Sequence, residues 1–341
     1  MDLDIRIGDT PEGPLRGIRV IDITTQITGP LCSQQLGDLG ADVIKVEPLH
    51  GEVARWMAPP QEAGLTGYYC QMNRNKRSLS IDLKQAAGVE ALKRLAAGAD
   101  ILVENFRGGI PDRLGIGYDD LSPLNERLIY VSITGYGRGG PYAHRPAYDM
   151  LAQGLVGMAP IQGEAFGDKP QLIQSAIVDK TTATTAAGAA LAALYARDGA
   201  NGTGRGQRVD VPMIDAYAAN SLADMICIDS FVPNDMPDPV PLALLRTWET
   251  ADGYAVGMAL QDNHFAAFCE ALDCEELLER EGCRNVGERI ADMTPWLDAM
   301  GEVIRRWPTE ELLARMDRAG VPFGPIKTIR EFVEDPQVIH N

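Results

Sequence analysis

Residues 17–46 read GIRVIDITTQITGPLCSQQLGDLGADVIKV, and this stretch decides the fold class. Two apolar runs, 17–23 and 41–46, have the composition of buried strands. Between them a Gly29-Pro30 turn precedes a helical pattern over 31–39. A strand, a helix and a strand in this order form a βαβ unit, which predicts a parallel sheet.

The same alternation continues downstream. Apolar residues at helical spacing end at Gly98, and the apolar run 101–103 follows as a strand. Further strands are predicted over 79–83, 128–133 and 207–211. We therefore predict an α/β protein with a Rossmann-like large domain built on a parallel sheet.

A proline-rich segment separates this part from the rest of the chain. Four prolines fall within residues 233–241, which is typical of a linker. We place the linker at 221–242, the large domain at 1–220 and a smaller domain at 243–326.

The smaller domain is predicted to be α+β. Residues 246–259 alternate around Asp252-Gly253, which indicates a β-hairpin. Helical patterns follow over 262–273, 286–305 and 309–319.

The composition excludes several classes of function. The 341 residues carry a net charge of −17, which argues against nucleic acid as the main partner because phosphate binding needs a basic face. A small anionic ligand is still allowed, since a few local arginines and lysines suffice for it.

The cysteines and the N-terminus give no special signal. The six cysteines form no C-x-x-C pair, so we expect neither a disulfide framework nor a metal site. The acidic start lacks the apolar core of a signal peptide, and no stretch approaches the roughly 20 apolar residues of a membrane span. We expect a cytoplasmic protein.

Asp179 is the candidate catalytic residue. It ends the apolar run 175–178 and opens a long segment of small residues with helical character. An aspartate at this place is typical of an N-cap, whose side chain accepts hydrogen bonds from the first turn. A helix N-terminus favours negative charge, so the carboxylate should be ionised at neutral pH, which is the state that a nucleophile needs.

Several segments, taken together, resemble the family III CoA-transferases. They are spread over nearly the whole chain and comprise residues 14–22, 29–30, 39–48, 75–84, 103–107, 145–153, 175–195 and 204–211. The combination is specific, although no single segment would be.

The resemblance implies that CoA moves between an acyl-CoA thioester and a carboxylic acid. Asp179 would attack the thioester carbonyl and form a mixed anhydride, CoA thiolate would leave, and it would return after the acids exchange. Backbone N–H groups near the developing oxyanion should lower the barrier. Coenzyme A and acyl-CoA would be substrates, with no permanently bound cofactor.

The resemblance also implies a CoA-binding site and a homodimer. By position, the CoA contacts are expected at Ile27, Thr28, Ile81, Asp82, Leu83, Lys84, Asn105, Phe106, Arg107, Arg113, Pro146, Ala147, Tyr148 and Asp149. Lys84 and Arg113 are the expected phosphate partners, and Phe106 either flanks the adenine or fills the core. The dimer of the family is ring-like and interlocked.

The chain departs from the family pattern at two places. Some relatives carry an arginine after the position of Glu47, where this chain has Pro48. Family members also continue past the point that matches Asn341 with a tail that returns to the first domain. Residues 327–341 would be the start of this returning segment, and the tail itself is absent from the sequence.

Two other functions remain open from the sequence. The α-methylacyl-CoA racemases share the fold and use a His-Asp pair. Their histidine comes directly before the position of Asp149, and this chain has Tyr148 there. His144 lies four residues earlier, where we expect a surface turn. The other alternative is a CoA-binding paralogue without turnover.

Overall fold

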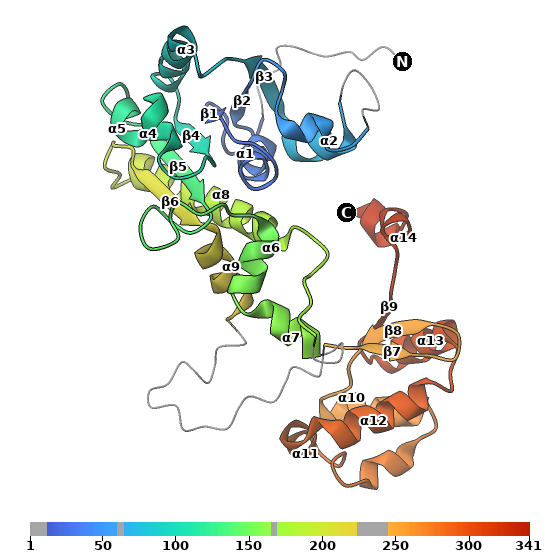
Figure 1. Ribbon diagram of the computed structural model, residues 1–341. Helices are drawn as coiled ribbons and strands as arrows, with labels where there is room; N and C mark the ends of the chain where they lie inside the picture. The colour runs from blue at the N-terminus through green and yellow to red at the C-terminus, as the bar shows by residue number, and fades with distance from the viewer. Residues whose placement is uncertain (1–11, 60–64, 165–168, 224–244) are drawn as a thin grey trace. The chain divides into compact units, whose positions relative to one another are not determined.

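A computed structural model describes residues 12–59, 65–164, 169–223 and 245–341 of the chain. The chain forms two compact units, Met1–Val232 and Pro233–Asn341 (Figure 1). Most of the predicted linker at 221–242 lies outside the described residues, and the predicted domain boundaries stay a prediction. Among the described helices, none combines the length and apolar character needed to cross a membrane.

The first unit is built on a parallel sheet of six strands in the order β3-β2-β1-β4-β5-β6. The strands are β1 (Arg19–Asp22), β2 (Asp42–Glu47), β3 (Lys76–Ser80), β4 (Ile101–Glu104), β5 (Ile129–Thr134) and β6 (Arg208–Pro212). This is the doubly wound Rossmann order, so the predicted fold class is confirmed.

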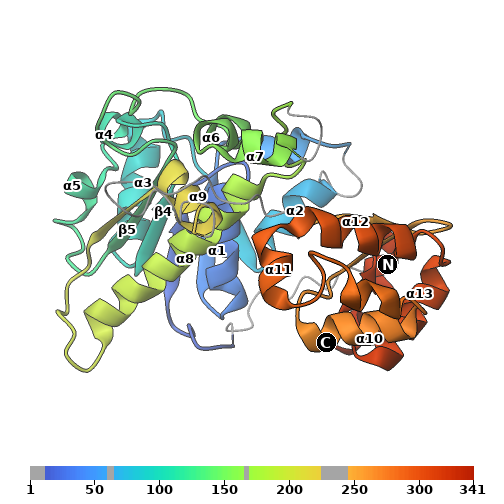
Figure 2. The ribbon, with the colours of Figure 1, turned by 90° about the horizontal axis from the view of Figure 1, so that it is seen from below.

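Helices cover both faces of this sheet (Figure 2). They are α1 (Thr28–Asp38), the 3₁₀ helix η1 (Val53–Trp56), α2 (Gly67–Asn73), α3 (Ala86–Ala96), α4 (Ile110–Leu114), α5 (Tyr118–Leu121), α6 (Asp149–Leu155), α7 (Met158–Glu164), α8 (Ile177–Asp198) and α9 (Met213–Ser221). Side chains of α1, α8 and α9 share one core with alternate strand residues, and those of α3 and α5 share the core on the other face.

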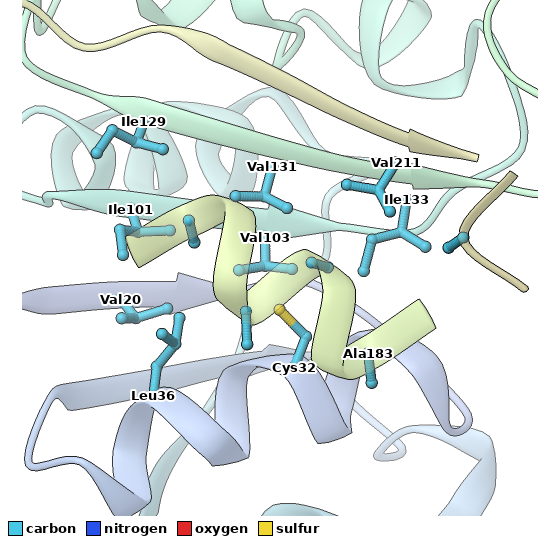
Figure 3. Packing of buried hydrophobic residues seen from close by; sticks show 14 of the residues in the cluster. Val20, Cys32, Leu36, Ile101, Val103, Ile129, Val131, Ile133, Ala183 and Val211 are labelled. Carbon is cyan, nitrogen blue, oxygen red and sulfur yellow. The ribbon is translucent and has the colours of Figure 1, made fainter. Parts of the chain in front are cut away.

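Helix α8 is central to the first core. Its buried face is made mostly of alanines, including Ala183, Ala186 and Ala190, which are 0% exposed. Figure 3 shows side chains of β4, β5 and α1 converging on this helix. Because alanine is small, the 22-residue helix can lie close to the strands and hold its first turn at a fixed place.

The structure corrects three local predictions in this unit. Gly29-Pro30 is no separate turn, because α1 already begins at Thr28 and proline is tolerated in the first turn of a helix. Strand β3 spans Lys76–Ser80, so residues 81–83 belong to the following loop. Asp179 is the third residue of α8, and the N-cap is Ala176.

The second unit combines a three-stranded antiparallel sheet with helices. The sheet pairs β7 (Thr247–Glu249), β8 (Tyr254–Gly257) and β9 (Phe323–Pro325), and the predicted hairpin is confirmed. The helices are α10 (Asp262–Ala271), the 3₁₀ helix η2 (Glu275–Glu279), α11 (Val286–Ala291), α12 (Met293–Ile304), α13 (Thr309–Ala319), α14 (Ile329–Val333) and α15 (Pro336–His340). The helix predicted over 286–305 is divided at Asp292, whose side chain accepts a hydrogen bond from Thr294 N–H and starts α12.

Candidate active site

The candidate site lies where the strand order of the sheet reverses. Strands β1 and β4 are neighbours, and the helices that follow them lie on opposite faces. Open α/β sheets bind ligands at this point, outside the carboxyl ends of the strands. The loops after the two strands are joined, because Asn105 accepts a hydrogen bond from Thr25 N–H at 3.0 Å and donates one to Thr25 O at 2.8 Å.

The turn formed by residues 24–29 connects β1 to α1 at this edge. A buried ionic cluster centred on Asp22 holds both of its ends. Asp22 accepts a hydrogen bond from Thr24 N–H, and Lys45 donates to Thr24 O at 2.9 Å. Lys76 donates to Pro30 O at 2.8 Å and to Asp22 at 2.9 Å. Although burial by itself raises the pKa of Asp22, the two lysines hold it well below its usual range.

The middle of the turn has an unusual backbone conformation. Gln26 has φ 71°, a left-handed conformation that costs energy for a residue with a side chain. Glu52, which is 1% exposed, accepts a hydrogen bond from Gln26 N–H at 3.2 Å. A Cβ atom at Gly29 would lie 2.3 Å from Thr24 Cβ, so only glycine fits there. The contacts on every side therefore fix one conformation of the turn.

This turn brings Thr28 to Asp179. The Thr28 hydroxyl donates a hydrogen bond to Asp179 Oδ1. Thr28 is buried at 3% exposure, and Asp179 is partly buried. No hydrogen bond from the described residues reaches Asp179 Oδ2.

The start of α8 is capped from another helix. Ala176 has no side chain that could cap, and Asp149 Oδ2 accepts the hydrogen bond of Asp179 N–H at 3.1 Å instead. Gln153 holds Asp149 by donating to Oδ1 at 2.6 Å, and it also accepts from Ile173 N–H at 2.9 Å. Asp179 therefore does not act as the N-cap that the sequence predicts, because Asp149 serves the helix end.

The electrostatic environment of Asp179 is unfavourable for its charge. Burial raises the pKa of Asp179 to about 6; the Thr28 hydrogen bond opposes this rise, Asp149 adds to it, and Lys180 opposes it. The carboxylate is ionised in most molecules at neutral pH, as the sequence predicts, but it is a stronger base than an exposed aspartate.

The predicted CoA-contacting residues border the same edge of the sheet. Ile27 and Thr28 follow β1, Ile81, Asp82, Leu83 and Lys84 follow β3, Asn105, Phe106 and Arg107 follow β4, Arg113 lies in α4, and Pro146, Ala147, Tyr148 and Asp149 precede or begin α6. The side chains of Ile81, Leu83 and Phe106 pack partly against the core that α3 and α5 cover. Tyr148 is 56% exposed.

Three exposed basic residues stand apart in this group. Within the described residues, Lys84, Arg107 and Arg113 form no salt bridge. By contrast, Arg74, Lys76 and Arg77 pair with aspartates. Cations without an internal partner are the ones that can bind phosphate oxygens.

Three residues near the site were not predicted from the sequence. Glu52 accepts a hydrogen bond from the turn, and Gln153 donates one to Asp149. Burial and the charges of Asp179 and Glu52 raise the pKa of Tyr68. A signal existed only for Gln153, since residues four apart on a helix face each other and it follows Asp149 by four. Glu52 and Tyr68 are distant in sequence from Asp179.

The histidine nearest to Asp149 in the sequence lies on the surface. His144 is exposed, and no hydrogen bond links it to Asp179 or Asp149 in the described part of the chain. Within the same residues, no group of three or more His, Cys, Asp or Glu side chains is placed to hold a metal ion.

Comparison with known proteins shows the family. Residues 15–341 match the model of CoA-transferase family III. The chain therefore belongs to the family III CoA-transferases, and it is a CoA-transferase.

Named relatives agree along nearly the whole chain. Human succinyl-CoA:glutarate CoA-transferase is 32% identical over 96% of this chain and 75% of its own length. Succinate–glutarate CoA-transferase of Agrobacterium fabrum is 34% identical over 95% of this chain and 83% of its own length. The crystal structure of a CaiB/BaiF family protein from Brucella suis has a TM-score of 0.82 at 34% identity, covering 96% of this chain and 88% of that one.

Proposed function

We propose that this CoA-transferase carries the acyl group on Asp179 as a mixed anhydride. The observation that supports this best is the placement of the carboxylate. It lies at the switch point of the sheet. Thr28 holds one of its oxygens, and the other has no hydrogen-bond partner in the described residues. Burial raises its pKa to about 6. A raised pKa makes an oxygen nucleophile more reactive while most of it is still ionised at neutral pH.

The reaction then proceeds in balanced steps. Asp179 Oδ2 attacks the thioester carbon, a C–O bond forms, the C–S bond breaks, and CoA leaves as thiolate. The carboxylate of the acceptor acid attacks the carbonyl carbon of Asp179 and displaces the donor acid, so that a new anhydride forms. The thiolate attacks the acceptor's acyl carbon, which gives the new thioester and restores Asp179.

The phosphates of CoA are proposed to bind three cations of the sheet edge that form no salt bridge within the described residues. Lys84, Arg107 and Arg113 follow β3 and β4, on the side where ligands of such sheets bind. Ile27 and the segment 146–149 would contact the pantetheine arm or the adenine. This arrangement lets a chain with a net charge of −17 bind a polyanion by local positive charge.

A dicarboxylic acid is the proposed acid substrate. The human and Agrobacterium relatives are named for succinate and glutarate, which carry a second carboxylate at the far end of the chain. Lys180 follows Asp179 in α8, its charge acts on the Asp179 carboxylate, and its Nζ lies 2.7 Å from Ser175 Oγ. An ammonium group at this place can pair with the distal carboxylate of such a substrate. The enzyme is further proposed to be a cytoplasmic homodimer of the interlocked type.

The test of this proposal is covalent trapping. The protein is incubated with succinyl-CoA and analysed by mass spectrometry, and hydroxylamine is added to capture the anhydride as a hydroxamate. We expect the mass increase on the peptide that contains Asp179 and its loss in Asp179→Ala. Exchange of deuterium at the α-carbon of an acyl-CoA without an adduct would instead indicate racemisation, and CoA binding without either outcome would indicate a protein without turnover.

A further inference from the structure

The turn formed by residues 24–29 is held more firmly than a connection between a strand and a helix requires. Asp22 and Lys45 fix Thr24, Asn105 fixes both backbone groups of Thr25, Glu52 fixes Gln26, and Lys76 fixes Pro30. Four of these groups are charged, and their side chains are nearly fully buried. Burial of charges is costly, so their concentration on one turn indicates that its conformation is needed for more than folding.

The residue that this turn presents is Thr28, and its hydroxyl meets Asp179. We propose that Thr28 is a positioning residue for the nucleophile: its hydroxyl fixes Asp179 Oδ1 and leaves Oδ2 directed at the thioester carbon. This inference rests on the proposed function of Asp179. It assigns to Thr28 a role at the carboxylate in place of the CoA contact that the sequence resemblance implies.

The same hydrogen bond counteracts the surroundings of Asp179. Burial and Asp149, from α6, both disfavour the negative charge. Burial raises the pKa of Tyr68 in α2, and the charge of the nearby Asp179 adds to this rise. Lys180 and Thr28 favour the ionised form of Asp179. Because Lys180 is exposed and its Nζ also contacts Ser175, the buried hydroxyl of Thr28 is the better-placed of these two stabilising groups.

The test compares three variants of the full chain. Thr28→Val keeps the shape and removes the hydroxyl, and Thr28→Ser keeps the hydroxyl. Thr182→Val is the matched control: this buried threonine of α8 also loses its hydroxyl, but its Oγ1 has no hydrogen-bond partner among the described residues. The pKa of Asp179 is measured by ¹³C NMR titration of labelled aspartate, with the signal assigned by its absence in Asp179→Asn. The rate of adduct formation with succinyl-CoA is measured between pH 5 and pH 8.

We expect Thr28→Val to raise the titration midpoint of Asp179 by about one pH unit and to slow adduct formation at pH 7 about ten-fold or more, the size expected for a hydrogen bond to a charged group. Thr28→Ser and Thr182→Val should keep the midpoint of the unaltered protein. If Thr28→Val fails to fold in a thermal unfolding test, Thr28→Ala replaces it.

Two results would overturn the inference. One is an unchanged midpoint and rate in Thr28→Val. The other is a raised KM for succinyl-CoA with an unchanged midpoint, which would mean that Thr28 contacts CoA. The proposed function fails separately: it is wrong if the unaltered protein forms no adduct at Asp179, and the NMR titration still decides whether Thr28 controls the carboxylate.

Discussion

Replacing Asp179 by asparagine should stabilise the protein at neutral pH. Asparagine has nearly the same shape and keeps an oxygen that can accept the hydrogen bond of Thr28, but it carries no charge. Asp179 has a pKa raised from 3.8 to about 6, first by burial and then by Asp149. Folding therefore places the ionised carboxylate in an environment that disfavours it.

The sign follows from the two pKa values. Below pH 3.8 the group is protonated in both the folded and the unfolded state and has no effect on the free energy of unfolding. Between 3.8 and about 6 the unfolded state loses the proton first, so stability falls as the pH rises, and above about 6 the full cost is present. At about 1.4 kcal/mol per pH unit the cost is about 3 kcal/mol, and partial exposure of the side chain reduces the expected gain in Asp179→Asn to about 1–3 kcal/mol.

The assay is urea unfolding between pH 4 and pH 8, followed by far-UV circular dichroism. Because the two units can unfold separately, hydrogen–deuterium exchange in the peptide 101–134 identifies the transition of the first unit. Asp198→Asn is the matched control on the same helix. Hydrogen bonds from Arg197 lower the pKa of Asp198, so its replacement should destabilise the protein at pH 7 and lose this effect in acid.

Two outcomes would contradict this prediction for Asp179→Asn. If Asp179→Asn leaves the free energy of unfolding of the first unit unchanged or lowers it at pH 7.5, while Asp198→Asn behaves as expected, the carboxylate of Asp179 is not held at an electrostatic cost. A gain that is equally large at pH 4 and pH 7.5 would also be contrary to it, because the effect must grow through the interval between the two pKa values.

Three further predictions concern substrate binding and the turn. Joint replacement of Lys84 and Arg113 by alanine removes phosphate contacts, so it should raise the KM for succinyl-CoA about ten-fold or more and leave kcat nearly unchanged. The KM should also depend less on salt concentration, which steady-state kinetics at two salt concentrations check. Lys180→Met should slow exchange with glutarate about ten-fold relative to a monocarboxylic acid of equal length, and equal losses for both acids would count against the proposed carboxylate contact. Gly29→Ala should lower the melting temperature strongly, because its Cβ would lie 2.3 Å from atoms of Thr24; calorimetry measures this, and an unchanged melting temperature would show that the turn can relax.

Most of the sheet could be predicted from the sequence because its central strands β1, β2, β4 and β5 are mostly buried. Val103 and Val131 are 0% exposed and belong to short, continuous apolar runs, which are the pattern of central parallel strands. Strand β3 is different: it lies at the edge of the sheet and most of its residues are exposed. An exposed strand has no apolar pattern, so the sequence predicts this strand at 79–83 instead of Lys76–Ser80.

The location of Asp179 at a helix start could be predicted, but its partners could not. Local sequence shows a carboxylate before an alanine-rich helix, and the N-cap rule assigns it the role that Asp149 in fact fills from 30 residues away. Thr28 contacts Asp179 from a distance of 151 residues in the sequence. Contacts of this kind depend on how the loops meet at the end of the sheet, and no local pattern encodes them.

The burial of Asp179 affects the proposed intermediate and the free enzyme in opposite ways. The free carboxylate carries a charge that burial and Asp149 both disfavour. The anhydride is neutral, so its formation removes the desolvation cost and the repulsion from Asp149 at the same time. The same surroundings that lower the stability of the folded protein therefore bring the free energy of the acyl-enzyme closer to that of the free enzyme with its thioester. A nearly balanced exchange of this kind is what a reversible transfer between two acids requires, because an intermediate that is much too high or much too low in free energy would slow one of the two half-reactions.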